Sequence, residues 1–242
     1  MSSKLRSFTE DLLERVGTAL SELLAHQVSF KRGQISAFDE EAFSPFGDFV
    51  ACLSGAVTGA HEGTLYVAFD LPRVIVLGAL LEMVPPDGIA ERLAEPAFDE
   101  ERADAFEEVG NILVGKVDEA IRDNLGEEKI HTKKGDTLTG TPGEVYARIT
   151  EGGDYYCLEA TVEIEGQESG PVRFLFHPPL VEEGFKADPE VTAWRLATAV
   201  EQEAEAAEGE VAAATEGTEE AAEGGVARAA AGGAEAEESE GG

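Results

Sequence analysis

An apolar repeat of helical period between Asp99 and Leu125 restricts the fold of this chain more than any other feature. Counting 100° per residue from Asp104 places five apolar side chains within about 40° of a single direction. These five are Phe106, Val109, Leu113, Val117 and Ala120. A helix with one long apolar stripe is stable only when another layer covers that stripe. The sequence therefore predicts a long helix that packs on a sheet or on other helices.

The opposite face of the same helix carries two poor helix formers. Within about 40° of the outward direction lie Asp104, Glu108, Asn111, Gly115, Asp118 and Arg122. Glycine in a helix interior costs about 1 kcal/mol relative to alanine, and an asparagine side chain competes for backbone hydrogen bonds. Glycine also admits a close backbone, and an amide both donates and accepts hydrogen bonds. Two interpretations stay open: a partner docks on this face, or it is an ordinary solvated face.

The other segments predict an α+β fold, with an antiparallel sheet and long helices packed on one face. Further helices are expected at 5–26, 71–83 and 188–204, the last with the lone Trp194. Extended segments are expected at 27–38, 48–59, 62–70, 129–139, 144–150, 155–165 and 170–177. The last two of these read as an antiparallel hairpin, and the turn "PPDG" is expected to end the helix at 71–83.

Composition divides the chain into a folded part and a tail. The formal charge is −32, and residues 201–242 hold thirteen glutamates against one arginine. This segment has no aromatic and almost no branched aliphatic residue, so nothing in it offsets the entropy of ordering. We expect a domain at 1–186, a C-terminal helix at 187–205 and a disordered acidic tail at 206–242, for which a purely solubilising role is the simplest reading.

Charge and motifs exclude several classes of function. The acidity argues against nucleic acid as a partner, because phosphates would be repelled. The longest apolar run, "VIVLGALLEMV", is too short to span a bilayer, and no signal peptide is recognised, so we expect a cytoplasmic protein. Cys52 and Cys157 lie in apolar alternating runs and are expected to be buried free thiols. The four histidines show no metal-ligand spacing, and no nucleophile elbow or phosphate-binding loop is present.

The outward face of the long helix carries a recognisable spacing. Asp104, Glu108 and Asn111 form the pattern DxxxExxN within "RADAFEEVGNILVGKVDEAI". This stretch resembles the phosphatase helix of the CheC/CheX/FliY family, in particular its single-motif CheX-like branch. The segment "FVACLSGAVTGAHEGTLYVAFDLPRVIVLGALLEMV" resembles the sheet-to-helix segment of that family, and "GDTLTG" resembles the strand after its motif helix. In the first helix, Glu14 is followed by Gly17 with no asparagine, so the two-site arrangement of CheC-type members is missing.

The resemblance implies a function. Members of this family dephosphorylate CheY-like response regulators in chemotaxis and related two-component signalling. Glu108 and Asn111 would then be the catalytic pair, with Asp104 and Gly115 in supporting or docking roles. The chain would bind no cofactor itself, because Mg²⁺ belongs to the partner receiver domain. The expected partner is a phosphorylated CheY-like receiver, and a homodimer is one assembly that the resemblance allows.

Two other classes of function compete with a phosphatase. One is a non-catalytic module that binds a receiver or a motor component without turnover. The other is a structural domain whose acidic tail carries the function, although this leaves the polar stripe unexplained. The presence of both Glu108 and Asn111 favours catalysis over the non-catalytic module. The sequence does not identify the receiver or the pathway.

Overall fold

The computed structural model describes residues 3–126 and 129–186. The predicted C-terminal helix with Trp194 and the acidic tail lie outside these residues. The domain boundaries proposed at positions 186 and 205 therefore stay predictions.

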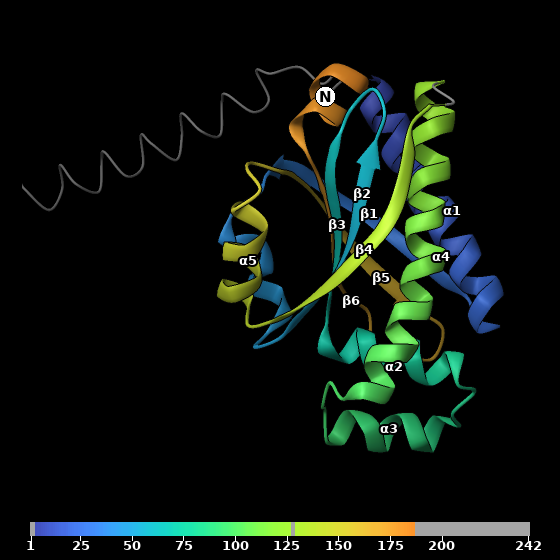
Figure 1. The fold of residues 1–242 in the computed structure, drawn as a ribbon. Helices are drawn as coiled ribbons and strands as arrows, with labels where there is room; N and C mark the ends of the chain where they lie inside the picture. The colour runs from blue at the N-terminus through green and yellow to red at the C-terminus, as the bar shows by residue number, and fades with distance from the viewer. Residues whose placement is uncertain (1–2, 127–128, 187–242) are drawn as a thin grey trace, which may run out of the picture. The chain divides into compact units, whose positions relative to one another are not determined.

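The described chain alternates helices and strands in an α+β order (Figure 1). The elements are α1 (Ser3–Leu24), β1 (Val28–Ala37), the 3₁₀ helix η1 (Glu40–Phe46), β2 (Val50–Thr58), β3 (Gly63–Asp70), α2 (Leu71–Leu81), α3 (Pro86–Ala94), α4 (Glu100–Leu125), β4 (His131–Gly140), α5 (Pro142–Thr150), β5 (Tyr156–Ile164), β6 (Gly170–Phe176) and the π-helical turn η2 (Leu180–Gly184).

The strands form one antiparallel sheet in the order β1-β5-β6-β3-β2-β4. The predicted hairpin is confirmed, since β5 pairs with β6 in antiparallel register with Leu158 opposite Phe174. Strands β1 and β4 are the two edges, so each has one neighbour only. The predicted fold class, an antiparallel sheet carrying long helices, is confirmed.

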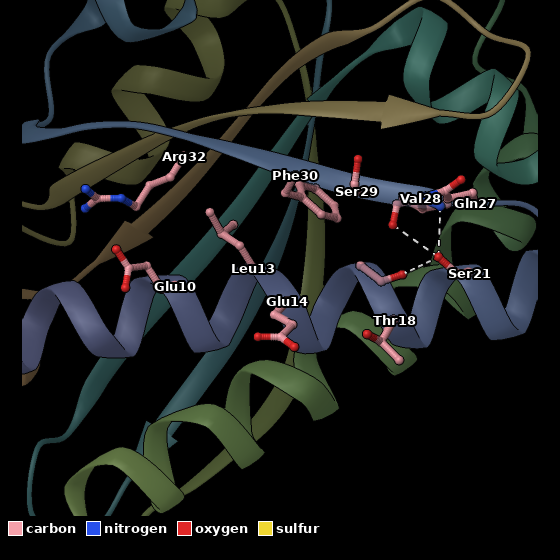
Figure 2. A pocket seen from close by; sticks show the side chains of 11 residues that line it. Glu10, Leu13, Glu14, Thr18, Ser21, Gln27, Val28, Ser29, Phe30 and Arg32 are labelled. Atoms are coloured by element: carbon pink, nitrogen blue, oxygen red, sulfur yellow. Dashed lines mark hydrogen bonds between the residues drawn. The ribbon is translucent and has the colours of Figure 1, made fainter.

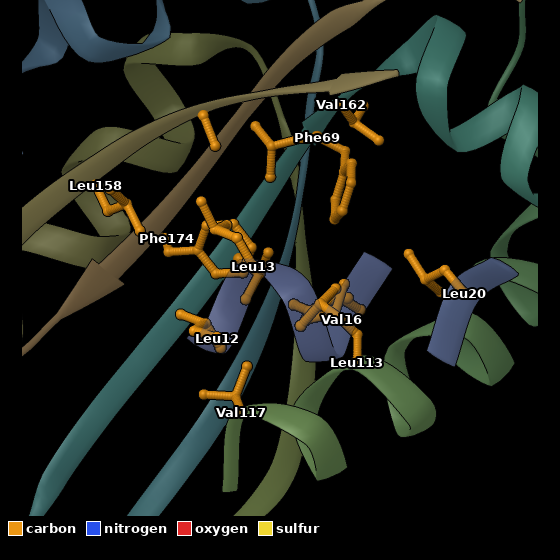
Figure 3. Packing of buried hydrophobic residues seen from close by; sticks show 14 of the residues in the cluster. Leu12, Leu13, Val16, Leu20, Phe69, Leu113, Val117, Leu158, Val162 and Phe174 are labelled. Atoms are coloured by element: carbon orange, nitrogen blue, oxygen red, sulfur yellow. The ribbon is translucent and has the colours of Figure 1, made fainter. Parts of the chain in front are cut away.

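The long helices cover one face of the sheet. The main apolar core joins residues of α1, α2 and α4 to the inward side chains of the central strands. Figure 3 shows this packing, with Leu12 and Val16 of α1 and Leu113 of α4 turned toward Phe69 and Phe174 of the sheet. The predicted helix-on-sheet layer is thus present and holds α4 in place along its length.

A second, smaller core covers the opposite face. Helix α5 and η1 pack over β2 and β5 there, and Cys52 and Cys157 are buried as free thiols, as expected. Burial raises the pKa of the Cys157 thiol to about 12. The prediction of a strand at 144–150 is wrong: this segment is α5, begun by a capping box between Thr141 and Glu144. The helix α3 was also missed, because "PPDG" was read as a turn and instead starts a helix.

The two halves of the described chain repeat one arrangement. Each half runs helix, strand, short helix, two-strand hairpin and helix, first from α1 to α2 and then from α4 to η2. The sheet order is symmetric about the β6–β3 pair, so that β1 corresponds to β4 and β5 to β2. This correspondence makes α1 the counterpart of α4.

No helix in the described part of the chain is long and apolar enough to cross a membrane.

Candidate active site on helix α4

Helix α4 has well-defined ends. The side chain of Asp99 accepts a hydrogen bond from the backbone N–H of Arg102 at 3.0 Å, which satisfies one of the free donors of the first turn. At the other end Gly126 has φ of 68°, the left-handed conformation that glycine adopts without strain. The helix therefore spans Glu100–Leu125, as the sequence predicted within one residue.

The buried stripe of α4 matches the sequence prediction. Phe106, Val109, Leu113, Val117 and Ala120 are all fully buried. Gly110 lies at the edge of this stripe, and a Cβ atom there would come within 2.6 Å of Leu53. A larger residue at position 110 would therefore have to displace the buried side chain of Leu53 on β2.

The outward stripe is exposed where the motif lies. Asp104, Glu108, Asn111 and Gly115 are all exposed. A Cβ atom at Gly115 would meet nothing within 4 Å. The Asn111 amide makes no hydrogen bond to any residue that the structure describes, so its donors and its acceptor are free for a ligand or a partner.

Further along the stripe the prediction needs a correction. Asp118 was expected to point outward with Asn111, but its side chain is only 15% exposed. It accepts a hydrogen bond from the backbone N–H of Thr132 at 2.5 Å and pairs with Arg122 at 2.9 Å. Asp118 therefore ties α4 to the start of β4, and the open surface ends near Gly115.

The flank of the stripe toward β4 is closed by paired polar groups that the sequence analysis missed. The carboxylate of Glu107 accepts hydrogen bonds from the ammonium of Lys134 and the hydroxyl of Thr137. Burial opposes ionisation of Glu107, but these two hydrogen bonds outweigh it and lower the pKa of the carboxyl. The charge of Glu107 is thus already compensated within the chain.

The flank toward α1 is open by comparison. Ile112 follows Asn111 and remains 38% exposed, which makes it one of two exposed large apolar residues, with Met83, in the described part of the chain. One turn further along, Lys116 and Glu119 border a hollow of about 440 Å³ between α4 and α1. The two sides of the motif therefore differ in chemistry.

Helix α1, the counterpart of α4, has no asparagine at the position equivalent to Asn111. Aligning the buried positions of the two helices places Leu5, Phe8, Leu12, Val16 and Leu20 on Phe106, Val109, Leu113, Val117 and Ile121. By this alignment the counterparts of Glu108 and Asn111 are Ser7 and Glu10.

The sequence analysis compared Glu14 and Gly17 with the motif, whereas the structure makes Ser7 and Glu10 the equivalent positions. Neither pair contains an asparagine, so the expectation that α1 lacks a second motif is unchanged. Glu10 accepts a hydrogen bond from Arg6 at 2.9 Å, which lowers its pKa. Figure 2 shows Glu10 and Arg32 turned toward one another above α1.

The histidines do not gather into a metal site. His177 and His61 are both buried, and Nε2 of His177 lies 2.8 Å from the backbone oxygen of His61. Among residues 3–126 and 129–186, no group of three or more histidine, cysteine, aspartate or glutamate side chains is arranged to hold a metal ion.

No protein-family model and no curated protein sequence matches this chain. Solved structures do match it. FliY from Thermotoga maritima superposes with a TM-score of 0.63 and 18% identity, covering 74% of this chain and 91% of that chain. The middle domain of FliM from H. pylori has a TM-score of 0.58 and 8% identity, covering 76% of this chain and 95% of that chain.

A third match is CheX from Borrelia burgdorferi, crystallised with CheY, BeF₃ and Mg²⁺. It has a TM-score of 0.45 and 14% identity, with 70% of this chain and 98% of that chain covered. Together with the FliY and FliM matches, the sheet and its helices confirm the resemblance to the CheC/CheX/FliY family at the level of the fold.

Proposed function

We propose that this protein is a phosphatase for the aspartyl phosphate of a CheY-like receiver domain. The observation that carries the proposal is the pair of exposed polar side chains Glu108 and Asn111 on one face of helix α4, beside the open surface at Gly115. Neither side chain has a hydrogen-bond or ion-pair partner among the residues that the structure describes. A helix that is buried along its other face can enter a shallow site on a partner without changing shape.

Hydrolysis of an aspartyl phosphate needs few catalytic groups from this chain. An aspartyl phosphate is a reactive acyl phosphate, and hydrolysis needs a water molecule in line with the bond that breaks. The amide oxygen of Asn111 accepts a hydrogen bond from that water and orients it. The water oxygen then bonds to phosphorus, the bond from phosphorus to the aspartyl oxygen breaks, and the products are inorganic phosphate and the free carboxylate.

A neutral amide suits this role better than a carboxylate. The phosphoryl oxygens are negatively charged, so a second anion at position 111 would repel them. The receiver's own Mg²⁺ and lysine supply the positive charge at the reacting group. Glu108 then serves as the docking residue for that lysine, and Asp104, one turn earlier, extends the polar contact.

A second candidate function is a receiver-binding or motor-associated adaptor that binds its partner without hydrolysing an aspartyl phosphate. The observation in its favour is the likeness of the fold to the middle domain of FliM, with 95% of that chain covered. The two functions share the docking face and differ in what Asn111 does.

Phosphate release from a phosphorylated CheY-like receiver separates the two candidates. The wild-type chain is expected to accelerate release, and Asn111→Ala should reduce the stimulated rate on the order of 10²-fold or more while binding is retained. Asn111→Asp is the matched variant that keeps the size of the side chain and adds a charge, and it should be equally inactive. A wild-type chain that binds the receiver without accelerating release would support the adaptor instead.

A further inference from the structure

The two flanks of the α4 motif differ in how their charges are compensated. Toward β4, Glu107 is held by Lys134 and Thr137. Toward α1, the hollow between the helices is lined in part by Glu14, Thr18 and Glu22 of α1. A partner that docks over Asn111 therefore meets a satisfied polar surface on one side and an unsatisfied one on the other.

The cationic side chains beside the hollow already form ion pairs within the chain. Lys116 pairs with Glu119 at 2.8 Å, and Arg15 pairs with Asp11 at 2.8 Å and Asp123 at 2.8 Å. Glu14 and Glu22 are exposed, and neither has an ion-pair partner among the residues that the structure describes. The hollow consequently carries uncompensated negative charge that a lysine or arginine side chain would match.

An apolar contact point connects the hollow to the motif. Ile112 lies one helical turn after Glu108 and one turn before Lys116, so the three side chains share one side of α4. Figure 2 shows Glu14 and Thr18 on α1, and both line the same hollow as Lys116 of α4. An exposed isoleucine between a polar motif and a charged hollow has the composition of the edge of a protein interface.

We propose that the receiver's footprint extends from Asn111 over Ile112 into the hollow between α1 and α4. There the receiver places an apolar side chain against Ile112 and a lysine or arginine beside Glu14 and Glu22. This inference rests on the proposed function for its partner. It assigns α1, which lacks the motif, the task of fixing the orientation in which the receiver docks.

The test measures affinity and turnover separately. The binding probe is a purified CheY-like receiver domain loaded with Mg²⁺ and beryllium trifluoride, a stable stand-in for the phosphoryl group. Ile112→Gln and the double variant Glu14→Lys/Glu22→Lys should each raise the Kd for this probe by about tenfold. The loss in the double variant should shrink between about 50 mM and about 300 mM salt, because salt screens charge pairs, and the loss in Ile112→Gln should not.

Two control variants match these changes away from the proposed footprint. Met83→Gln replaces the more exposed of the two apolar residues, at 88%, and Glu91→Lys reverses an exposed charge on α3. Both should bind as the wild type does. In phosphate-release assays the footprint variants should raise KM and leave kcat unchanged, in contrast to Asn111→Ala. Melting curves of every variant verify that the fold is intact.

The outcomes separate this inference from the proposed function. Folded footprint variants that bind the probe as tightly as the wild type would overturn the footprint and leave the phosphatase proposal standing. A wild type that binds the probe and releases no phosphate would overturn the phosphatase proposal and leave the footprint to be decided by affinity. A wild type that binds no receiver would overturn both.

Discussion

At the scale of single residues, Asn111 and Gly115 are the positions where helix propensity and structure disagree. Both are exposed, so packing among residues 3–126 and 129–186 explains neither of them. Gly110, by contrast, is buried and lies against the side chain of Leu53. The sequence predicted the outward direction of Asn111 and Gly115 from the helical period alone. It could not separate a docking face from a solvated one, because both leave the same pattern.

Gly115→Leu tests that distinction. The substitution should stabilise the protein by up to about 1 kcal/mol, since leucine is the better helix former and the position is open. It should also depress phosphate release sharply, because an isobutyl group fills space that the receiver needs. Thermal melting and phosphate release on one preparation decide the matter.

Two further variants serve as controls for Gly115→Leu. Gly115→Ala adds a single carbon and should gain stability with a much smaller loss of activity. Gly110→Ala should lose stability through its contact with Leu53. A stabilised and fully active Gly115→Leu protein would refute docking at this position.

At the scale of elements, periodicity over a long segment was a better guide than local composition. Helix α4 was predicted within one residue because its apolar stripe repeats over its whole length. Helix α5 was predicted as a strand because its core "EVYARI" contains β-branched and aromatic residues, although Thr141 and Glu144 carry the spacing of a capping box.

The contact between Glu107 and Lys134 could not be predicted from the sequence. It joins α4 to a strand 27 residues away, and no local pattern marks such a pair.

The Glu107 contact predicts a pH dependence of stability. The pKa of Glu107 is lowered from its ordinary value of 4.5 in the folded chain, so its contribution is present above that value and is lost as pH falls through the folded pKa. The wild type should melt at a higher temperature than Glu107→Gln at pH 7, and this difference should shrink and disappear as the pH is lowered below the ordinary value of 4.5 and through the lowered pKa of Glu107. Glu91→Gln is the exposed control, expected to show no such gap. A gap that persists in acid would mean that Glu107 acts by packing and not by charge.

At the scale of the whole molecule, we expect much of the negative charge to lie in a segment that the domain does not need in order to fold. The net charge is −32, and residues 201–242 hold thirteen of the acidic side chains with one arginine. Removing 206–242 should leave both the melting temperature and the phosphatase rate nearly unchanged, because the segment has no aromatic residue and only two branched aliphatic ones, Val211 and Val226, to bury. Differential scanning calorimetry and phosphate release on full-length and shortened chains check this. A drop of several degrees would show that the segment packs on the domain.

The symmetric sheet order also governs how the chain must fold. Strand β1 pairs with β5 and strand β4 pairs with β2. The first strand of each repeated half therefore pairs with the hairpin of the other half. Neither half can complete its own part of the sheet, which makes the described domain one cooperative unit rather than two tandem ones. Pairing β1 with β5 brings together residues more than a hundred positions apart, as with Val28 and Ile164. Contact order of this kind slows folding, so we expect the complete sheet, on which the helix that carries Asn111 packs, to form only after both halves of the domain have been synthesised.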